Sequence, residues 1–216
     1  MPRDVVTTVY QFDELPDDRA RERARDWYRS LRDSNDLQPV IDQCVEAGEI
    51  IGITFTRHAV RLMGGGTRQD PNVWWSLGYC QGDGACFDGS YAYAPKSKIK
   101  VRHEYPRDLA LQAIADELFE IQKRYAWSLR ATITHSGSGF SPDVECELVD
   151  RSFSGTRGPR ELLEADAREV REIMRAFCTW IYQSLRTEDE YQSEPAQVDE
   201  SIRANEYEFL ITGERA

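Results

Sequence analysis

The sequence predicts an α+β fold, in which an antiparallel sheet of short strands packs with several helices and long helices lie toward the C-terminus. Short segments rich in β-branched and aromatic residues are joined mostly by turns, and the amphipathic segments come in blocks instead of alternating with strands. The chain has 216 residues with 40% hydrophobic and 11% aromatic content, which is enough for a substantial core. We expect a single α+β domain over residues 1–216, with an acidic helical segment over about residues 187–216.

Apolar residues three or four positions apart predict the helices. One helix is expected after Pro16, one over about residues 37–47 with Gly48 as its stop signal, one from Pro106, and the longest from Pro159. We expect these apolar stripes to pack in the core and not to line a cofactor site.

Strands are expected between the helices, where β-branched and aromatic residues concentrate. The last two should form a hairpin through the Ser/Gly-rich residues 136–143. Residues 73–79 and 90–94 should be antiparallel neighbours, with residues 81–89 as their connection. The predicted strands cover residues 5–10, 50–57, 73–79, 90–94, 97–103, 127–135 and 144–149.

The segment Gln81-Gly82-Asp83-Gly84-Ala85-Cys86-Phe87 is the most informative part of the chain. Glycine beside a single acid at a strand end lets the backbone adopt positive φ and approach another group closely. Such a segment builds either a tight bulged turn or a small binding site, and the sequence leaves both open. Gln81, Asp83 and, next to a second glycine-rich turn, His135 are the candidate binding residues.

Acidic residues are concentrated near the C-terminus. Residues 187–216 contain nine acids against two arginines, and therefore −7 of the net charge of −11. These acids form either a solvated helical face or a surface that imitates nucleic-acid phosphates and docks on a basic partner. The same negative field disfavours direct binding of duplex DNA. The candidate acidic surface consists of Glu188, Asp189, Glu190, Glu194, Asp199 and Glu200.

Basic residues gather in one short segment, where three of the four lysines and an arginine lie at every second position. A strand over residues 97–103 would place them on one face and Ile99 and Val101 on the other. That face is either an edge protected by charge against aggregation or a small phosphate-binding surface beside the glycine-rich loop. The residues are Lys96, Lys98, Lys100 and Arg102.

A short match to cysteine proteases provides an enzymatic alternative. Asp83-Gly84-Ala85-Cys86 resembles the Asp-Gly-x-Cys element of ovarian-tumour-type cysteine proteases, in which the thiol lies at a helix start and a distant histidine is its base. His103 or His135 would be that base. The residues after Cys86 are typical of a turn and not of a helix, so we expect Cys86 to be a small buried hydrophobic residue.

Composition and spacing argue against several other classes. Five scattered cysteines without C-x-x-C spacing favour reduced thiols in the cytoplasm. The chain has three histidines without acids at ligand spacing, so no metal site is predicted. The pair Gly82 and Gly84 precedes no predicted helix, so no nucleotide-cofactor fold is predicted either. We therefore expect no cofactor. No run approaches the ~20 apolar residues of a membrane span, and the N-terminus lacks an apolar signal-peptide core. We expect a cytoplasmic protein without membrane contact.

Six motifs occur in an order that resembles a family of uncharacterised phage and prophage accessory proteins, over nearly the whole chain. They are Val-Tyr-Gln-Phe-Asp-Glu-Leu at residues 9–15, Ala-Arg-Asp-Trp-Tyr at 24–28, the segment at 81–87, His-Ser-Gly at 135–137, Trp-Ile-Tyr at 180–182 and Ala-Asn-Glu-Tyr-Glu-Phe at 204–209. The resemblance implies a protein aimed at host machinery or immunity. Members often have tyrosines and a further histidine after His-Ser-Gly, whereas residues 138–142 here read Ser-Gly-Phe-Ser-Pro, so no tyrosine–histidine site is expected there.

These observations predict a phage-type accessory protein that acts by binding a host or defence protein, with anti-defence inhibition as its role. The first alternative is a protein that binds a small ligand or nucleotide, in which an anionic ligand would use the glycine-rich loop and the lysine segment. The second alternative is a cysteine hydrolase. The sequence favours a binding protein over an enzyme.

Overall fold

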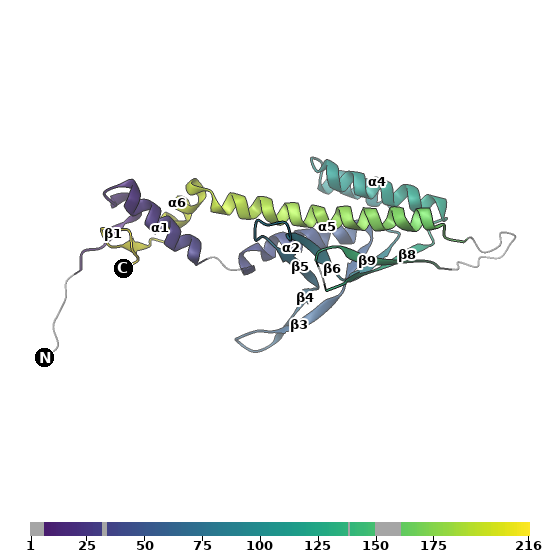
Figure 1. Ribbon diagram of the computed structural model, residues 1–216, viewed down its shortest axis with the longest axis horizontal. Helices are drawn as coiled ribbons and strands as arrows, with labels where there is room; N and C mark the ends of the chain where they lie inside the picture. Colours follow the sequence, from purple (N-terminus) through teal and green to yellow (C-terminus); the bar gives the residue numbers. More distant parts are fainter. Residues whose placement is uncertain (1–6, 32–33, 138, 150–160) are drawn as a thin grey trace. The chain divides into compact units, whose positions relative to one another are not determined.

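The computed structural model describes residues 7–31, 34–137, 139–149 and 161–216, and Figure 1 shows their helices and strands. The fold is α+β and the described strands pair antiparallel, as predicted. The chain divides into two compact units, one of residues 39–185 and one that combines the described residues up to 38 with residues 186–216. The sequence predicted a single domain whose acidic C-terminal segment begins close to this boundary.

A four-stranded antiparallel sheet lies at the centre of the unit of residues 39–185. Its strands have the order β2 (Ile53–Phe55), β7 (Gly89–Ala92), β8 (Leu129–His135) and β9 (Pro142–Leu148). Buried and exposed residues alternate along these strands, because one face of the sheet meets the helices and the other meets solvent. The predicted hairpin of the last two strands is confirmed, with Leu129 opposite Leu148 and His135 opposite Pro142.

Helices α2 (Gln38–Ile51), α4 (Leu109–Arg124) and α5 (Glu164–Ser193) supply the buried residues that face this sheet. Helices α4 and α5 are antiparallel and joined near both ends of α4. The Trp180 indole of α5 donates to the Asp108 carboxylate at the start of α4 at 2.7 Å. At the other end, Arg124, the last residue of α4, donates to Asp166 of α5 at 2.6 Å. The helix predicted from Pro106 is therefore α4, and the one predicted from residue 159, which lies outside the described residues, is α5.

Three phenylalanines from different elements form the centre of the core. The Phe55 ring of β2 lies 4.9 Å from the Phe87 ring, which lies 5.7 Å from the Phe177 ring of α5. Gly48 of α2 faces the same cluster, since a Cβ there would lie 2.6 Å from the Phe55 ring. The prediction that Gly48 ends its helix is wrong, because this glycine permits close packing and α2 continues to Ile51.

Three strands each cross from one sheet to another at a single residue. Strand β2 leads into β3 (Arg57–Arg61), β4 (Thr67–Pro71) into β5 (Val73–Ser76), and β6 (Gly84–Phe87) into β7. The crossing residues are Thr56, Asn72 and Asp88, and their backbones form a closed ring of hydrogen bonds. The N–H of Thr56 donates to Asp88 at 2.9 Å, that of Asn72 to Thr56 at 2.8 Å, and that of Asp88 to Asn72 at 3.0 Å. We call these three residues the strand junction.

The predicted pairing of residues 73–79 with residues 90–94 is wrong. Strand β5 pairs with β6, with Ser76 opposite Gly84, so their connection is residues 77–83, and β7 lies between β2 and β8 instead. The sequence interpretation took all of residues 81–89 as a turn because of its glycines. Gly84 is a strand residue, however, and it lacks a side chain because a Cβ there would lie 2.7 Å from Phe140.

The predicted strand over residues 97–103 is also wrong, because this segment is helix α3 (Ser97–Glu104). Ile99 is 70% exposed while Val101 is fully buried, although a strand would have placed both on one face. Ser97 and Val101 form the buried side, which is the four-residue spacing of a helix.

The unit that combines the two ends of the chain has a hydrophobic cluster of its own. It contains β1 (Tyr10–Gln11), α1 (Asp18–Ser30), α6 (Pro195–Ala204), β10 (Glu208–Phe209) and the short 3-10 helices Phe12–Glu14 and Ser34–Leu37. Strand β1 pairs with β10. Of the predicted strand 5–10, residues 5 and 6 lie outside the described residues, residues 7–9 are not strand, and only Tyr10 belongs to β1. The cluster consists of Phe12, Leu15, Ala20, Ala24, Val198, Ile202 and Phe209.

Replacing Val101 tests the helical assignment of α3. Val101→Ala should lower the free energy of unfolding by about 2 kcal/mol, because it removes buried methyl groups and leaves a cavity. Ile99→Ala is the matched control and should change it by less than about 0.5 kcal/mol, because Ile99 is exposed. Urea unfolding followed by circular dichroism measures both. Equal losses at the two positions would favour the strand.

Candidate functional site

The connection between β5 and β6 is organised by the carboxylate of Asp83. One oxygen, Oδ1, accepts hydrogen bonds from the Ser76 hydroxyl and the Gly78 N–H, both at 2.9 Å. The other, Oδ2, accepts from the Cys80 N–H at 2.9 Å. Because an ionised carboxylate accepts several hydrogen bonds at once, one acid is enough to fix this turn. We call residues 77–83 the Asp83 loop.

These hydrogen bonds hold the pKa of Asp83 below its usual value. Desolvation alone would raise the pKa, but the Cys80 N–H, the Ser76 hydroxyl and the Gly78 N–H together stabilise the charged form more strongly. The charged carboxylate is therefore part of the folded loop.

The Asp83 loop presents Tyr79 and Gln81 at the surface. Tyr79 is 59% exposed and has a φ of 54°, in the left-handed region. A large side chain is uncommon there and persists where the surrounding structure fixes the backbone. Gln81 is exposed two residues further along the loop. The bonds to Asp83 thus hold an exposed aromatic side chain near an exposed amide.

An aromatic stack lies on the strand that leads into this loop. The Trp74 ring of β5 and the His135 ring of β8 are nearly parallel, with centroids 4.7 Å apart and an angle of 21°. The Phe140 ring continues the stack at 6.3 Å from His135. His135 Nε2 donates to the Gly139 carbonyl at 2.9 Å, which fixes the orientation of the imidazole. Trp74 is 37% exposed, so one ring of the stack is available to a partner.

Asp88 ties the stack to the strand junction. Its Oδ1 accepts from the backbone N–H of His135 at 2.7 Å, and its Oδ2 accepts from the Asn72 side-chain amide at 3.3 Å. The Asn72 side-chain oxygen in turn lies 2.8 Å from Nδ1 of His58, at the base of β3. The same junction therefore supports the stack and both hairpins.

Of the predicted binding residues, Gln81 and Asp83 lie in one loop, and His135 of β8 stacks on Trp74 of β5, the strand that leads into this loop. Asp83 stabilises the loop through inward hydrogen bonds, which the turn interpretation of this segment anticipates. Sequence reasoning missed Trp74 and Tyr79. The signal was the aromatic content of residues 73–79, which was interpreted as strand propensity.

The predicted basic face of four residues does not exist, because a helix distributes these side chains around its axis. Lys98 and Arg102, one turn apart on α3, both bind Asp116 of α4, at 3.2 Å and 2.7 Å. Lys96 precedes the helix with a φ of 65°. Lys100 lies away from Asp116 and lines a groove instead.

That groove lies between α2 and α3 and has a volume of about 660 Å³. Its one ammonium group, on Lys100, shares the groove with the carboxylates of Glu46 and Glu104. Burial and the nearby Glu46 raise the pKa of Tyr105, which is consistent with a negative potential there. A phosphate-bearing ligand is disfavoured by this charge balance. The lining residues are Gln43, Glu46, Ile50, Lys100, Glu104 and Tyr105.

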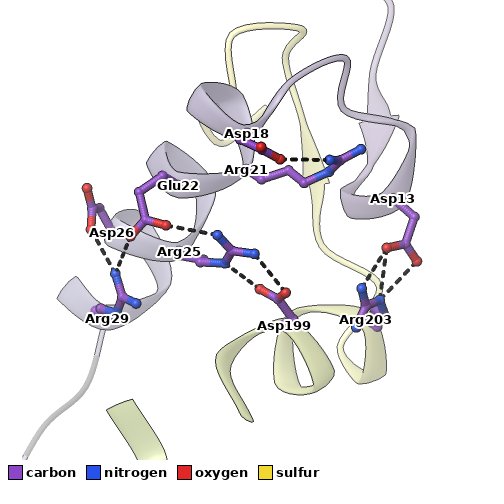
Figure 2. Close-up of polar contacts among 9 residues, drawn as sticks. All are labelled: Asp13, Asp18, Arg21, Glu22, Arg25, Asp26, Arg29, Asp199 and Arg203. Carbon is purple, nitrogen blue, oxygen red and sulfur yellow. Dashed lines mark hydrogen bonds and ion pairs between the residues drawn. The ribbon is translucent and has the colours of Figure 1, made fainter. Parts of the chain in front are cut away.

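The predicted acidic surface is partly neutralised by the protein's own side chains. Figure 2 shows Asp199 of α6 bound to Arg25 of α1 by two hydrogen bonds, at 2.6 Å and 2.8 Å. The same view shows Arg203 of α6 bound to Asp13 at 2.8 Å. These pairs link the two ends of the chain.

The other acids of the predicted surface lie at the end of α5 and in α6. Glu190 accepts from Arg186 at 2.7 Å, and Glu188 accepts from the Gln192 amide at 2.7 Å. Asp189 is half-buried, while Glu194 and Glu200 are exposed. The residues therefore differ in environment and do not form a uniform row of solvated carboxylates.

Cys86 lies in strand β6 and is fully buried, so it does not occupy a helix start as the protease resemblance requires. Its thiol neighbours that of Cys178 on α5, and the contact with Cys86 together with burial raises the pKa of Cys178. His103 lies 2.9 Å from Glu104, and His135 binds Gly139. The expectation that Cys86 is a buried small residue is confirmed.

Within the described residues, no group of three or more His, Cys, Asp or Glu side chains is arranged to hold a metal ion. None of the helices in that part of the chain combines the length and apolarity of a membrane span.

The pH dependence of stability tests the role of Asp83. Its folded pKa is lower than the unfolded value of about 3.9, so the carboxylate adds stability above that pH and loses it as the pH falls through the folded pKa. Urea midpoints of the wild type and Asp83→Asn should differ at neutral pH and converge in acid. Glu117→Gln, at an exposed position of α4, is the control and should match the wild type throughout. A difference that persists undiminished in acid would contradict this role.

Thiol alkylation tests the assignment of Cys86. Brief treatment with iodoacetamide at neutral pH should label the exposed Cys80 and spare Cys44, Cys86 and Cys178, which are buried. Burial also raises the pKa of Cys44 to about 12, so little of its reactive thiolate forms. Peptide mass spectrometry reports the order of labelling. Fast labelling of Cys86 that disappears in His103→Ala or His135→Ala would support a hydrolase instead.

Comparison with known proteins identifies the family of this chain. No curated protein and no solved structure matches it. A family described as a domain of unknown function, DUF8835, matches residues 37–194. The match contains the whole unit of residues 39–185, with the Asp83 loop and the stack, and leaves α1 outside. The chain therefore belongs to the DUF8835 family.

Proposed function

We propose that the protein is a phage-type accessory protein that binds a host or defence protein in the host cytoplasm and inhibits it. The observation that carries the proposal is the Asp83 loop, in which three hydrogen bonds to one carboxylate hold Tyr79 at the surface. Together with the neighbouring stack it forms the loop surface, which we define as Trp74, Tyr79, Gln81 and His135.

The composition of the loop surface suits a protein partner. Tryptophan and tyrosine are enriched among the residues that contribute most to binding energy at protein interfaces. A glutamine beside them provides a donor and an acceptor for a partner backbone. Because the Asp83 hydrogen bonds fix the loop beforehand, association loses less conformational entropy than it would with a mobile loop. Rigid exposed aromatic side chains of this kind support protein recognition.

A small ligand or nucleotide is less well supported. The oxygens of Asp83 accept hydrogen bonds from its own loop, so this carboxylate is not directed at a ligand. The groove between α2 and α3 holds two carboxylates beside Lys100, which disfavours a phosphate group. Both observations support partner binding over the ligand alternative.

The hydrolase alternative is less well supported for a different reason. A nucleophilic thiol needs access to substrate and a nearby base that lowers its pKa. Cys86 is fully buried in a strand. The phage origin and the anti-defence role rest on the order of the six sequence motifs, of which three lie in the matched family region and three at the joined ends of the chain.

One partner-binding assay on matched variants tests the proposal. Bait protein is incubated with host-cell lysate, and captured proteins are identified by mass spectrometry and then purified for titration. Tyr79→Ala with Gln81→Ala should raise the Kd for the captured protein roughly tenfold or more, as loss of a central interface residue does. Asp83→Ala should weaken binding too, because it releases the loop.

The control neutralises the exposed acids through Glu190→Gln, Glu194→Gln and Glu200→Gln. It should bind as the wild type does, with little change in salt dependence. If this variant alone loses binding, the partner docks on the acidic surface and the loop surface is not the site. If none of the variants changes the Kd, the proposed site is wrong.

A further inference from the structure

The hairpin of β3 and β4, residues 57–71, extends from the strand junction into solvent (Figure 1). Twelve of its fifteen residues are exposed and none is buried. At its turn, Leu62 is 45% exposed and Met63 is fully exposed. An isolated two-stranded hairpin is only marginally stable in water, so a hairpin of this length gains stability from a surface that covers it. We call residues 57–71 the arm.

The two faces of the arm differ in charge. Arg57 and Arg61 lie on one face, with Ala59 and its neighbour Gln69 between them. Arg57 makes long contacts, 3.5 Å to Glu49 and 3.4 Å to the Gln69 carbonyl, and Arg61 is exposed. On the opposite face Arg68 is neutralised by two hydrogen bonds to Asp70, at 2.5 Å and 2.8 Å. The first face therefore carries a charge of +2, and we call it the arginine face.

The four-stranded sheet has a solvent face that is acidic along one edge. Its exposed residues are short and uncharged on β2 and β7, so this half of the face is shallow. Strand β9 contributes three carboxylates and β8 one guanidinium, a charge of −2. The residues of this open face are Thr54, Ser90, Ala92, Arg130, Thr132, Thr134, Asp143, Glu145 and Glu147.

The arginine face and the open face match in charge and in spacing. Arg57 and Arg61 are four residues apart on one strand, and so are Asp143 and Glu147, which corresponds to about 13 Å in each case. Between the two arginines the arm presents Ala59, and between the two acids the sheet presents Glu145 opposite Thr132. A ribbon laid along β9 on the open face would place each guanidinium near a carboxylate, and the small Ala59 between them would leave room for Glu145.

We infer that the arm docks on the open face of a second copy of this chain. Each copy has one arm and one open face, so a twofold axis allows both arms to be covered at once in a closed dimer. The chain is also an acidic partner for its own arm. The arm carries three arginines against one aspartate, a charge of +2. Because the whole chain has a net charge of −11, the residues outside the arm carry −13. This inference does not rest on the loop surface, which belongs to the other hairpin.

A protein partner fits the arm better than nucleic acid does. Two arginines on one face would neutralise two phosphates at most, whereas the strongly negative remainder of the chain repels a duplex. Against the open face the same two arginines meet an equal number of net negative charges.

Charge reversal with compensation tests the dimer. The wild type should shift with concentration from a mass of 24.9 kDa to twice that value in multi-angle light scattering, and the dimer should weaken as salt is raised. Arg57→Glu with Arg61→Glu should be monomeric, and so should Asp143→Arg with Glu147→Arg. An equimolar mixture of these two double variants should form a heterodimer, because each arm then meets an open face of opposite charge. Recovery in the mixture also shows that both variants are folded.

Arg107→Glu with Arg168→Glu makes the same change in charge at exposed positions elsewhere in this unit and should leave the dimer intact. A wild type that stays monomeric at every concentration would overturn the inference. So would a dimer that survives the arm reversal, or a mixture of double variants that stays monomeric. Arm-dependent binding of a 20-base-pair duplex by a monomeric wild type would assign the arm to nucleic acid instead.

Discussion

The ring of backbone hydrogen bonds among Thr56, Asn72 and Asp88 is the constraint on which the rest of the sheet unit depends. Three strands leave their sheets at one point, and each crossing residue would otherwise have a backbone group without a strand partner. The ring satisfies these groups reciprocally and sets the directions of both hairpins. The Asp88 carboxylate extends this support to His135, so the junction also positions the aromatic stack.

Carboxylates act as structural acceptors throughout this acidic protein. Asp83 closes a loop, Asp88 joins the junction to β8, and Asp108 caps α4 while accepting from the indole of Trp180 on α5. Asp199 of α6 accepts from Arg25 of α1 and so links the two ends of the chain. A negative net charge is therefore a poor guide to the binding surface, because several acids are consumed in holding the fold. In the two proposed interactions, exposed aromatic and arginine side chains make the contacts instead.

The two hairpins that leave the junction present different chemistry. The β5–β6 hairpin presents aromatic rings on a loop fixed by Asp83, which suits recognition of an unlike protein. The β3–β4 hairpin presents two arginines that match the acids of the protein's own open sheet face. A dimer formed through the arms leaves each loop surface in place on its own hairpin. The two proposals, partner binding and self-association, therefore place their contacts on separate hairpins of one strand junction.

The sequence by itself determined the α+β class, the helices beginning after Pro16 and Pro106, and the β8–β9 hairpin, because long apolar stripes and a glycine-rich turn are local signals. It also identified the segment around Asp83 as a special turn. Tertiary structure alone decided the rest. In residues 97–103, Ile99 and Val101 have the two-residue spacing of a strand face, and Ser97 and Val101 have the four-residue spacing of a helix face. Burial of Val101 together with Ser97, while Ile99 is exposed, selected the helix. Which strand pairs with β5, and which residue stacks on Trp74, depend on contacts between segments far apart in the chain, and no local pattern encodes them.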